Sequence, residues 1–194
     1  LLLASSSLQH PFADGTTATK GRITQLPRRR QVWAWASGLH AKTNVAQLRN
    51  ASWAGIFDGV QAFCSVMMRE DGTGLDVTNE TIWKGCIEEL KPTVQDEAGM
   101  KFHIVLGGRV PDEHPVQPMI DAAIAFCRKW NLNGISLDDE YDCAPRSALS
   151  PFKRWMSYVN ALASGVKAAA GLDSSAAVQS MFGIQDVPYN PYCG

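Results

Sequence analysis

The chain has 194 residues, of which 45% are hydrophobic, and its formal net charge is −1 at pH 7. This length is sufficient for one domain with a sizeable core. The balanced charge argues against nucleic acid or a membrane surface as the partner, and no run approaches the roughly 18 apolar residues of a membrane-spanning helix.

The first 30 residues differ in composition and periodicity from the rest of the chain. Leu1–Ala4 followed by Ser5–Ser7 is similar to the end of a hydrophobic signal segment. Residues 8–30 lack periodicity and are poor in acids, which is also the composition of an organelle transit peptide. We therefore expect residues 1–30 to be a largely unstructured signal, pro-segment or transit-like leader, and residues 31–194 to be a truncated domain.

Two N-glycosylation sequons start at Asn50 and Asn79, and they favour a secreted or endolysosomal glycoprotein over an organelle-targeted protein. The five cysteines show no CxxC spacing and no neighbouring His at ligand spacing, so we expect no zinc and no other cofactor. Cys64 and Cys127 lie in apolar runs and are expected to be small buried side chains. Cys143 and Cys193 lie in loop-like sequence and are candidates for a disulfide.

After Arg30, strand-like and helix-like segments alternate in chain order. The strand patterns are short, apolar and bounded by turn residues, and they predict strands at 32–36, 55–64, 102–106, 134–138 and 176–182. The helical patterns show apolar spacing, capping residues and terminal glycines, and they predict helices at 44–52, 80–99, 115–130 and 150–170.

This alternation predicts a parallel sheet with crossover helices. Two architectures fit: a (β/α)₈ barrel of the TIM type, and an open doubly wound parallel sheet. A barrel usually needs about 250 residues. If the fold is a barrel, we expect it to be incomplete, with about five of its eight strands present.

The fourth predicted strand carries the strongest chemical signal. With a side-chain period of two, Ser136, Asp138 and Glu140 share one face of the strand, and Ile135 and Leu137 share the other. Glu140 lies at the carboxyl end, where parallel α/β folds place their sites. A carboxylate beneath a carboxyl group raises the pKa of the upper group, as a general acid requires. The sequence therefore predicts Glu140 as general acid and Asp138 as its partner.

The run from Asn133 to Tyr141 resembles the fourth-strand signature of glycoside hydrolase family 18, D-G-x-D-x-D-x-E followed often by Tyr. Ile104–Gly108 resembles the family's S-x-G-G strand end, and Trp33–Trp35 lies where its barrel begins. The resemblance implies a (β/α)₈ barrel that cleaves β-linked N-acetylglucosamine glycans by a substrate-assisted, retaining mechanism. It also implies that Glu140 protonates the glycosidic oxygen and that Asp138 orients the substrate acetamido group.

The chain departs from that signature at three positions: Asn133 and Ser136 replace acids, and Asp139 replaces an apolar residue. These changes leave open a chitinase-like protein that binds glycans without cutting them. A metal-dependent phosphodiesterase barrel is a further alternative, because clustered carboxylates suit Mg²⁺ or Ca²⁺.

Other residues are weaker candidates for contact with an N-acetylglucosamine oligosaccharide or polysaccharide. Besides Ser136, these are Tyr141, Trp33, Trp35, Asp58, Gln179 and Met181. Aromatic rings stack on sugars but also fill barrel cores, and Asp58 fits either the cavity or a cap on the turn at Gly59. We expect His103 to be a core histidine.

Overall fold

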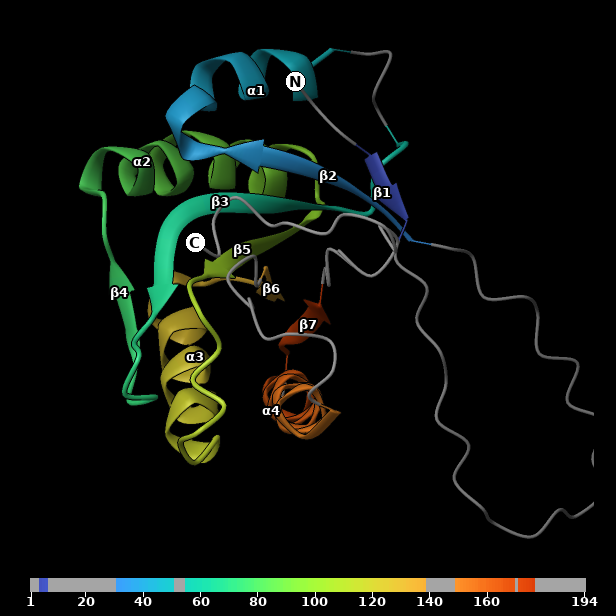
Figure 1. Ribbon diagram of the computed structural model, residues 1–194. Helices are drawn as coiled ribbons and strands as arrows, with labels where there is room; N and C mark the ends of the chain where they lie inside the picture. Colours follow the sequence, from blue (N-terminus) through green and yellow to red (C-terminus); the bar gives the residue numbers. More distant parts are fainter. Residues whose placement is uncertain (1–3, 7–30, 51–54, 139–148, 170, 177–194) are drawn as a thin grey trace, which may run out of the picture.

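The protein is described by a computed structural model that covers residues 4–6, 31–50, 55–138, 149–169 and 171–176. Its strands form one seven-stranded sheet in the order β1-β2-β3-β5-β6-β7, with β4 paired to β3 (Figure 1). The strands are β1 (Ala4–Ser6), β2 (Val32–Ser37), β3 (Gly59–Met68), β4 (Leu75–Val77), β5 (Lys101–Gly107), β6 (Gly134–Leu137) and β7 (Asp173–Ala176).

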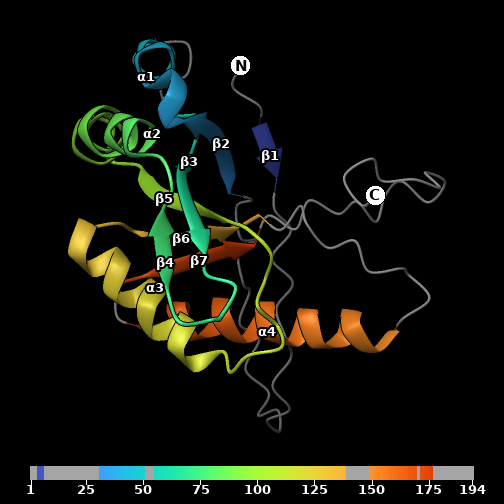
Figure 2. The same cartoon turned by 60° about the vertical axis from the view of Figure 1, so that its left-hand side comes forward.

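Helical segments connect the parallel strands. They are η1 (Gly38–His40), α1 (Ala41–Leu48), α2 (Glu80–Lys84), the π-helical segments η3 (Gly85–Leu90) and η4 (Pro92–Glu97), α3 (Gln117–Trp130) and α4 (Leu149–Ala168). Figures 1 and 2 show α1 and α2 beside the β2–β3 part of the sheet, and α3 and α4 beside the β6–β7 part. In the described part of the chain no helix is both long and apolar enough to cross a membrane.

The strand order decides between the two predicted architectures. Strands β2, β3, β5, β6 and β7 are parallel and follow one another in chain order, whereas a doubly wound sheet reverses its order at a switch point. The described sheet is open, and β1 and β4 are its antiparallel additions. The fold is therefore an incomplete (β/α)₈ barrel with five of its parallel strands described, as the sequence predicts.

Several element boundaries differ from the predictions. α1 begins at Ala41 rather than Asn44, β3 runs over Gly59–Met68 rather than 55–64, and β7 begins at Asp173 rather than at residue 176. The hairpin strand β4 was not predicted. The single helix predicted at 80–99 is divided into α2, η3 and η4. Pro92 has no backbone N–H to donate in a regular α-helical ladder, and the helical hydrogen bonding is π-type on both sides of Lys91.

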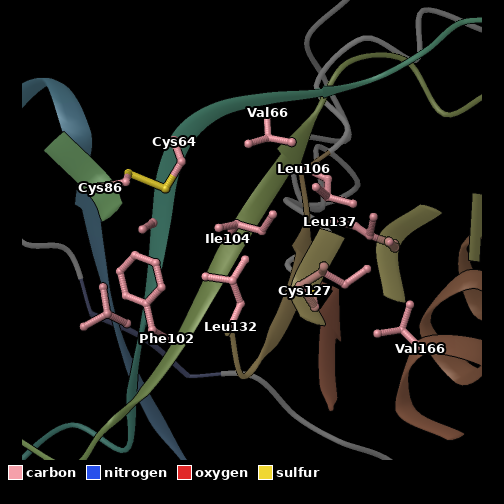
Figure 3. Close-up of a cluster of buried hydrophobic side chains, with 14 of the residues drawn as sticks. Cys64, Val66, Cys86, Phe102, Ile104, Leu106, Cys127, Leu132, Leu137 and Val166 are labelled. Carbon is pink, nitrogen blue, oxygen red and sulfur yellow. A yellow bond between two sulfur atoms is a disulfide. The ribbon is translucent and has the colours of Figure 1, made fainter. Parts of the chain in front are cut away.

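The core lies between the sheet and its helices. On one face of the sheet, alternate side chains are apolar and buried, and they pack against the apolar faces of the helices (Figure 3). The strand residues of this core are Ala34, Ala36, Val60, Ala62, Cys64, Val66, Phe102, Ile104, Leu106, Ile135 and Leu137. Among the described residues, the helices pack on this face only, and the opposite face is the inner face of the barrel.

A disulfide joins the two layers of the core. Cys64 on β3 is bonded to Cys86 on η3, and both residues are fully buried (Figure 3). The prediction that Cys64 is only a small buried side chain is therefore incomplete, because periodicity shows burial but not which cysteine lies opposite. Cys127 is buried and free, as predicted. Cys143 and Cys193 lie outside the described residues.

Candidate functional site

The inner face of the sheet is rich in polar and aromatic side chains. Its members come from alternate positions of four neighbouring strands, so they lie in layers from the amino ends to the carboxyl ends. They are Trp33, Trp35, Gln61, Phe63, His103, Val105, Ser136 and Asp138. In a barrel of this type the functional site lies at the carboxyl ends of the strands, so the inner-face residues nearest those ends are the candidates for it.

Asp138 lies at the carboxyl end of β6. Its backbone N–H donates to the carbonyl oxygen of Leu106 at 3.1 Å, which extends the β5–β6 ladder one residue past the strand. Its side chain is on the same face as Ser136, and the two residues are 4% and 0% exposed. Asp138 is therefore held in a buried position at the end of the sheet where the site was predicted.

Gly134 shows why the second position of the motif is glycine. A Cβ atom at this position would collide with the backbone carbonyl of Asp173 on β7, and it would lie 3.0 Å from Nε2 of His103 on β5. Only a residue without a side chain allows both neighbours this close. Asn133, where the family pattern has an acid, accepts the backbone N–H of Phe102 at 2.8 Å and so joins the starts of β5 and β6.

Trp33 belongs to the core of the barrel rather than to an open sugar site. It is 2% exposed, its ring lies 4.4 Å from the His103 ring, and it covers Gly59, where a Cβ would collide with it. Trp33 is also in the layer nearest the strand amino ends. Of the two roles that the sequence left open for Trp33, the structure favours packing in the barrel core, and it confirms that His103 is a core histidine.

Trp35 lies one layer closer to the carboxyl ends and is half-buried. Its ring is 4.8 Å from that of Phe63 on β3, at an interplanar angle of 41°. Sequence reasoning missed Phe63, although its alternation with Gln61 along β3 is the signal that would have placed both on the inner face. The two rings form the aromatic part of this face.

Asp58 is at the opposite end of the sheet from Asp138. Its Oδ2 atom accepts the backbone N–H of Val32 at 2.8 Å, so it ties the amino ends of β2 and β3 together. Of the two roles predicted for it, the structure favours the local structural one.

The carboxyl end of β3 is shaped by a bulge next to the site. Phe63 pairs with Val105 and Val66 pairs with Leu106, so Cys64 and Ser65 are extra residues on β3. Ser65 has φ 58°, and its carbonyl oxygen accepts the Thr78 N–H at 2.9 Å. Beyond the bulge, Met67 pairs with Gly107, the first of the paired glycines that end β5.

The charge on the inner face is concentrated near the amino ends. Burial lowers the pKa of His103 to about 4, with Asp173 opposing this shift and Lys101 adding to it. Burial alone would raise the pKa of Asp173, but the hydrogen bond and charge of Lys101 outweigh it, so that pKa is lowered. The Lys101 Nζ to Asp173 Oδ2 distance is 2.6 Å. His103 is thus neutral near pH 7.

Four predicted site residues lie outside the described residues: Glu140, Tyr141, Gln179 and Met181. Within the described ranges, no three His, Cys, Asp or Glu side chains gather as metal ligands. The carboxylates that motivated a metal site, Asp139, Glu140 and Asp142, are not among those residues.

Two surface hollows are present away from Asp138. One, of about 370 Å³, lies between the η1–α1 and α2–η3 segments and is lined by residues that include His40, Lys84 and Glu88. The other, of about 480 Å³, lies at the amino ends of β5 to β7 and includes Lys101, Lys167 and Asp173. Neither includes an inner-face residue predicted to bind substrate.

No family model and no curated protein matches the chain. Solved chitinases match its fold. A class V chitinase from Nicotiana tobaccum aligns with a TM-score of 0.51 and 17% identity over 66% of this chain and 40% of that chain. A class V chitinase from Pseudomonas fluorescens Pf-5 aligns with a TM-score of 0.53 and 13% identity over 74% of this chain and 43% of that chain.

A family 18 chitinase from Cycas revoluta, solved with allosamidin, aligns with a TM-score of 0.50 and 17% identity over 70% of this chain and 39% of that chain. A mutant of the tobacco enzyme was solved in complex with NAG4. The chain spans about two-fifths of the length of these chitinases. At such low identities the similarity concerns the fold alone: the described chain has the fold of part of a family 18 chitinase barrel.

Proposed function

We propose that the chain is part of a glycoside hydrolase of chitinase type that cleaves β-linked N-acetylglucosamine glycans. The observation that carries the proposal is Asp138, buried on the inner face at the carboxyl end of β6, in a sheet with the fold of family 18 chitinases. In the proposed mechanism Glu140 protonates the glycosidic oxygen. Asp138 holds the substrate acetamido group, which attacks the anomeric carbon with retention of configuration.

The burial of Asp138 supports the orienting role. A carboxylate that is only 4% exposed is held in one place by the surrounding β5–β6 ladder, and such pre-organisation is what substrate-assisted attack needs. Gly134 and Asn133 set the start of the same strand, so the backbone that carries Asp138 is constrained at both ends.

Hydrolysis of a chitotriose reporter tests the proposal. Removing either carboxyl group in Glu140→Gln or Asp138→Asn is expected to lower kcat by at least about 100-fold, the contribution typical of a positioned acid. Asp121→Asn, on the exposed side of α3, is the matched control and is expected to keep the wild-type rate. Equal rates for wild type and Glu140→Gln would refute the proposal.

A second candidate is glycan binding without cleavage, and Ser136 favours it. This residue is fully buried one layer below Asp138 on the same face, and it is a serine where the family signature has an acid, so position 136 carries no carboxylate that could share a proton with Asp138. Oligosaccharide binding by titration without turnover would support this function. Turnover gained in Ser136→Asp, but not in the uncharged Ser136→Asn control, would assign the loss of catalysis to this position.

A further inference from the structure

We propose that Asn79 is an occupied N-glycosylation site and that the protein matures in an oxidising secretory compartment. The proposal concerns the corner between β4 and α2. It does not depend on the proposed glycosidase function, because the residues involved are on the outer side of the sheet and take no part in the inner face.

The complete sequon at this corner is accessible. Asn79, Glu80 and Thr81 are all exposed, and Asn79 has an extended backbone with φ −140° and ψ 107°. An attached glycan therefore projects into solvent without displacing a packed side chain. The other sequon, which begins at Asn50, includes residues outside the described ranges. The proposal therefore concerns Asn79, whose sequon is fully described.

The structural role of Asn79 is compatible with the modification. Its Oδ1 atom accepts the backbone N–H of Ile82 at 3.1 Å and caps the start of α2. Glycosylation uses the other amide atom, Nδ2. A bond forms between Nδ2 and C1 of a lipid-pyrophosphate-linked oligosaccharide, the C1–O bond to the pyrophosphate breaks with the electron pair leaving on the lipid pyrophosphate, and Nδ2 loses one proton. The product keeps Oδ1 as an acceptor, so the cap survives.

A second and independent observation points to the same compartment. The buried Cys64–Cys86 disulfide joins β3 to η3, the helical segment that continues from α2. Disulfides of this kind persist in oxidising compartments and are rare in the cytosol. N-glycans are added in a secretory lumen that is also oxidising, so one route accounts for both the disulfide and the accessible sequon.

Peptide mapping of the protein isolated from its native cells tests the proposal directly. Enzymatic removal of N-glycans in ¹⁸O-labelled water is expected to convert Asn79 to ¹⁸O-labelled aspartate. Proteolytic digestion without a reducing agent is expected to yield disulfide-linked peptides that contain Cys64 and Cys86. An unmodified Asn79, or free thiols at both cysteines, overturns the proposal.

Matched variants distinguish loss of the glycan at Asn79 from loss of the helix-capping hydrogen bond of Asn79. In an Asn50→Gln background, secreted from eukaryotic cells behind a strong signal, Thr81→Ser is expected to keep the glycan. Asn79→Asp and Thr81→Ala are expected to lose it while keeping a capping oxygen. A mass decrease on deglycosylation that persists in Thr81→Ala, or is absent from both the parent and Thr81→Ser, contradicts the assignment of Asn79.

Discussion

Polar side chains are buried on the inner face at a density that core packing alone does not favour. Gln61, His103, Ser136 and Asp138 are 2%, 0%, 0% and 4% exposed. Burial of a polar group is costly unless its hydrogen bonds are replaced, so each of these side chains constrains how its neighbours pack. In the proposed function, Asp138 is the member of this group that contacts the substrate.

His103 makes the stability of the fold depend on pH. Its pKa is about 4 in the folded protein because burial disfavours the charged ring, and the ordinary value is 6.5. Between these values the unfolded chain binds a proton that the native state does not. Stability is therefore expected to fall as pH decreases from 6.5 towards 4, by up to about 3 kcal/mol.

Chemical denaturation of wild type and His103→Gln at several pH values checks this prediction. The wild-type free energy of unfolding is expected to fall more steeply than that of the variant between pH 5 and 6.5. Carboxylates such as Asp173 contribute in the same direction but mainly below this window, because their unfolded pKa values are near 4. Parallel profiles for the two proteins would show that His103 is not the group responsible.

At the scale of elements, the contact between η1 and the α2–η3 segment depends on two glycines. A Cβ on Gly38 would collide with the carbonyl oxygen of Ile82, and a Cβ on Gly85 would collide with that of Gly38. Because both obstacles are backbone atoms, neither can move aside by rotation of a side chain. The helical layer can approach the end of β2 only with glycine at both positions.

Gly85→Ala is expected to lower the free energy of unfolding by about 1–3 kcal/mol, the usual cost of overpacking. Gly165→Ala in α4 is the matched control, since the three atoms nearest to its added methyl group all belong to the side chain of Ile120 and none to the backbone. Its gain in helix propensity offsets part of that contact, so a smaller loss is expected. Urea denaturation measures the free energy of unfolding of both variants. If Gly165→Ala lowers it as much as Gly85→Ala does, the prediction is wrong.

At the scale of the whole molecule, the disulfide joins the sheet layer to the helical layer. Cys64 and Cys86 are separated by 22 positions in the chain, and the link limits the conformations of the unfolded state. For a closed loop of this size the expected stabilisation is about 3 kcal/mol. It also anchors the bulge of β3 beside the carboxyl ends of the strands.

The Cys64→Ala/Cys86→Ala double variant is expected to lose that stabilisation, as measured by thermal or denaturant unfolding. Cys127→Ala controls for the removal of a buried thiol without loss of a cross-link. A reducing agent is expected to destabilise the wild-type protein but not the double variant. If the agent has no effect on either protein, Cys64 and Cys86 are not bonded in solution.

The sequence by itself determined the alternation of strands and helices, the strand at Gly134–Leu137 and the face that Ser136 and Asp138 share. Local periodicity and turn residues are sufficient for these features, because they follow from the geometry of a single element. Tertiary structure decided which cysteine pairs with Cys64, that Trp33 and Asp58 stabilise the amino ends of the strands, and that Phe63 joins Trp35 on the inner face. Those features depend on neighbours distant in sequence, whose register and bulges no local pattern encodes.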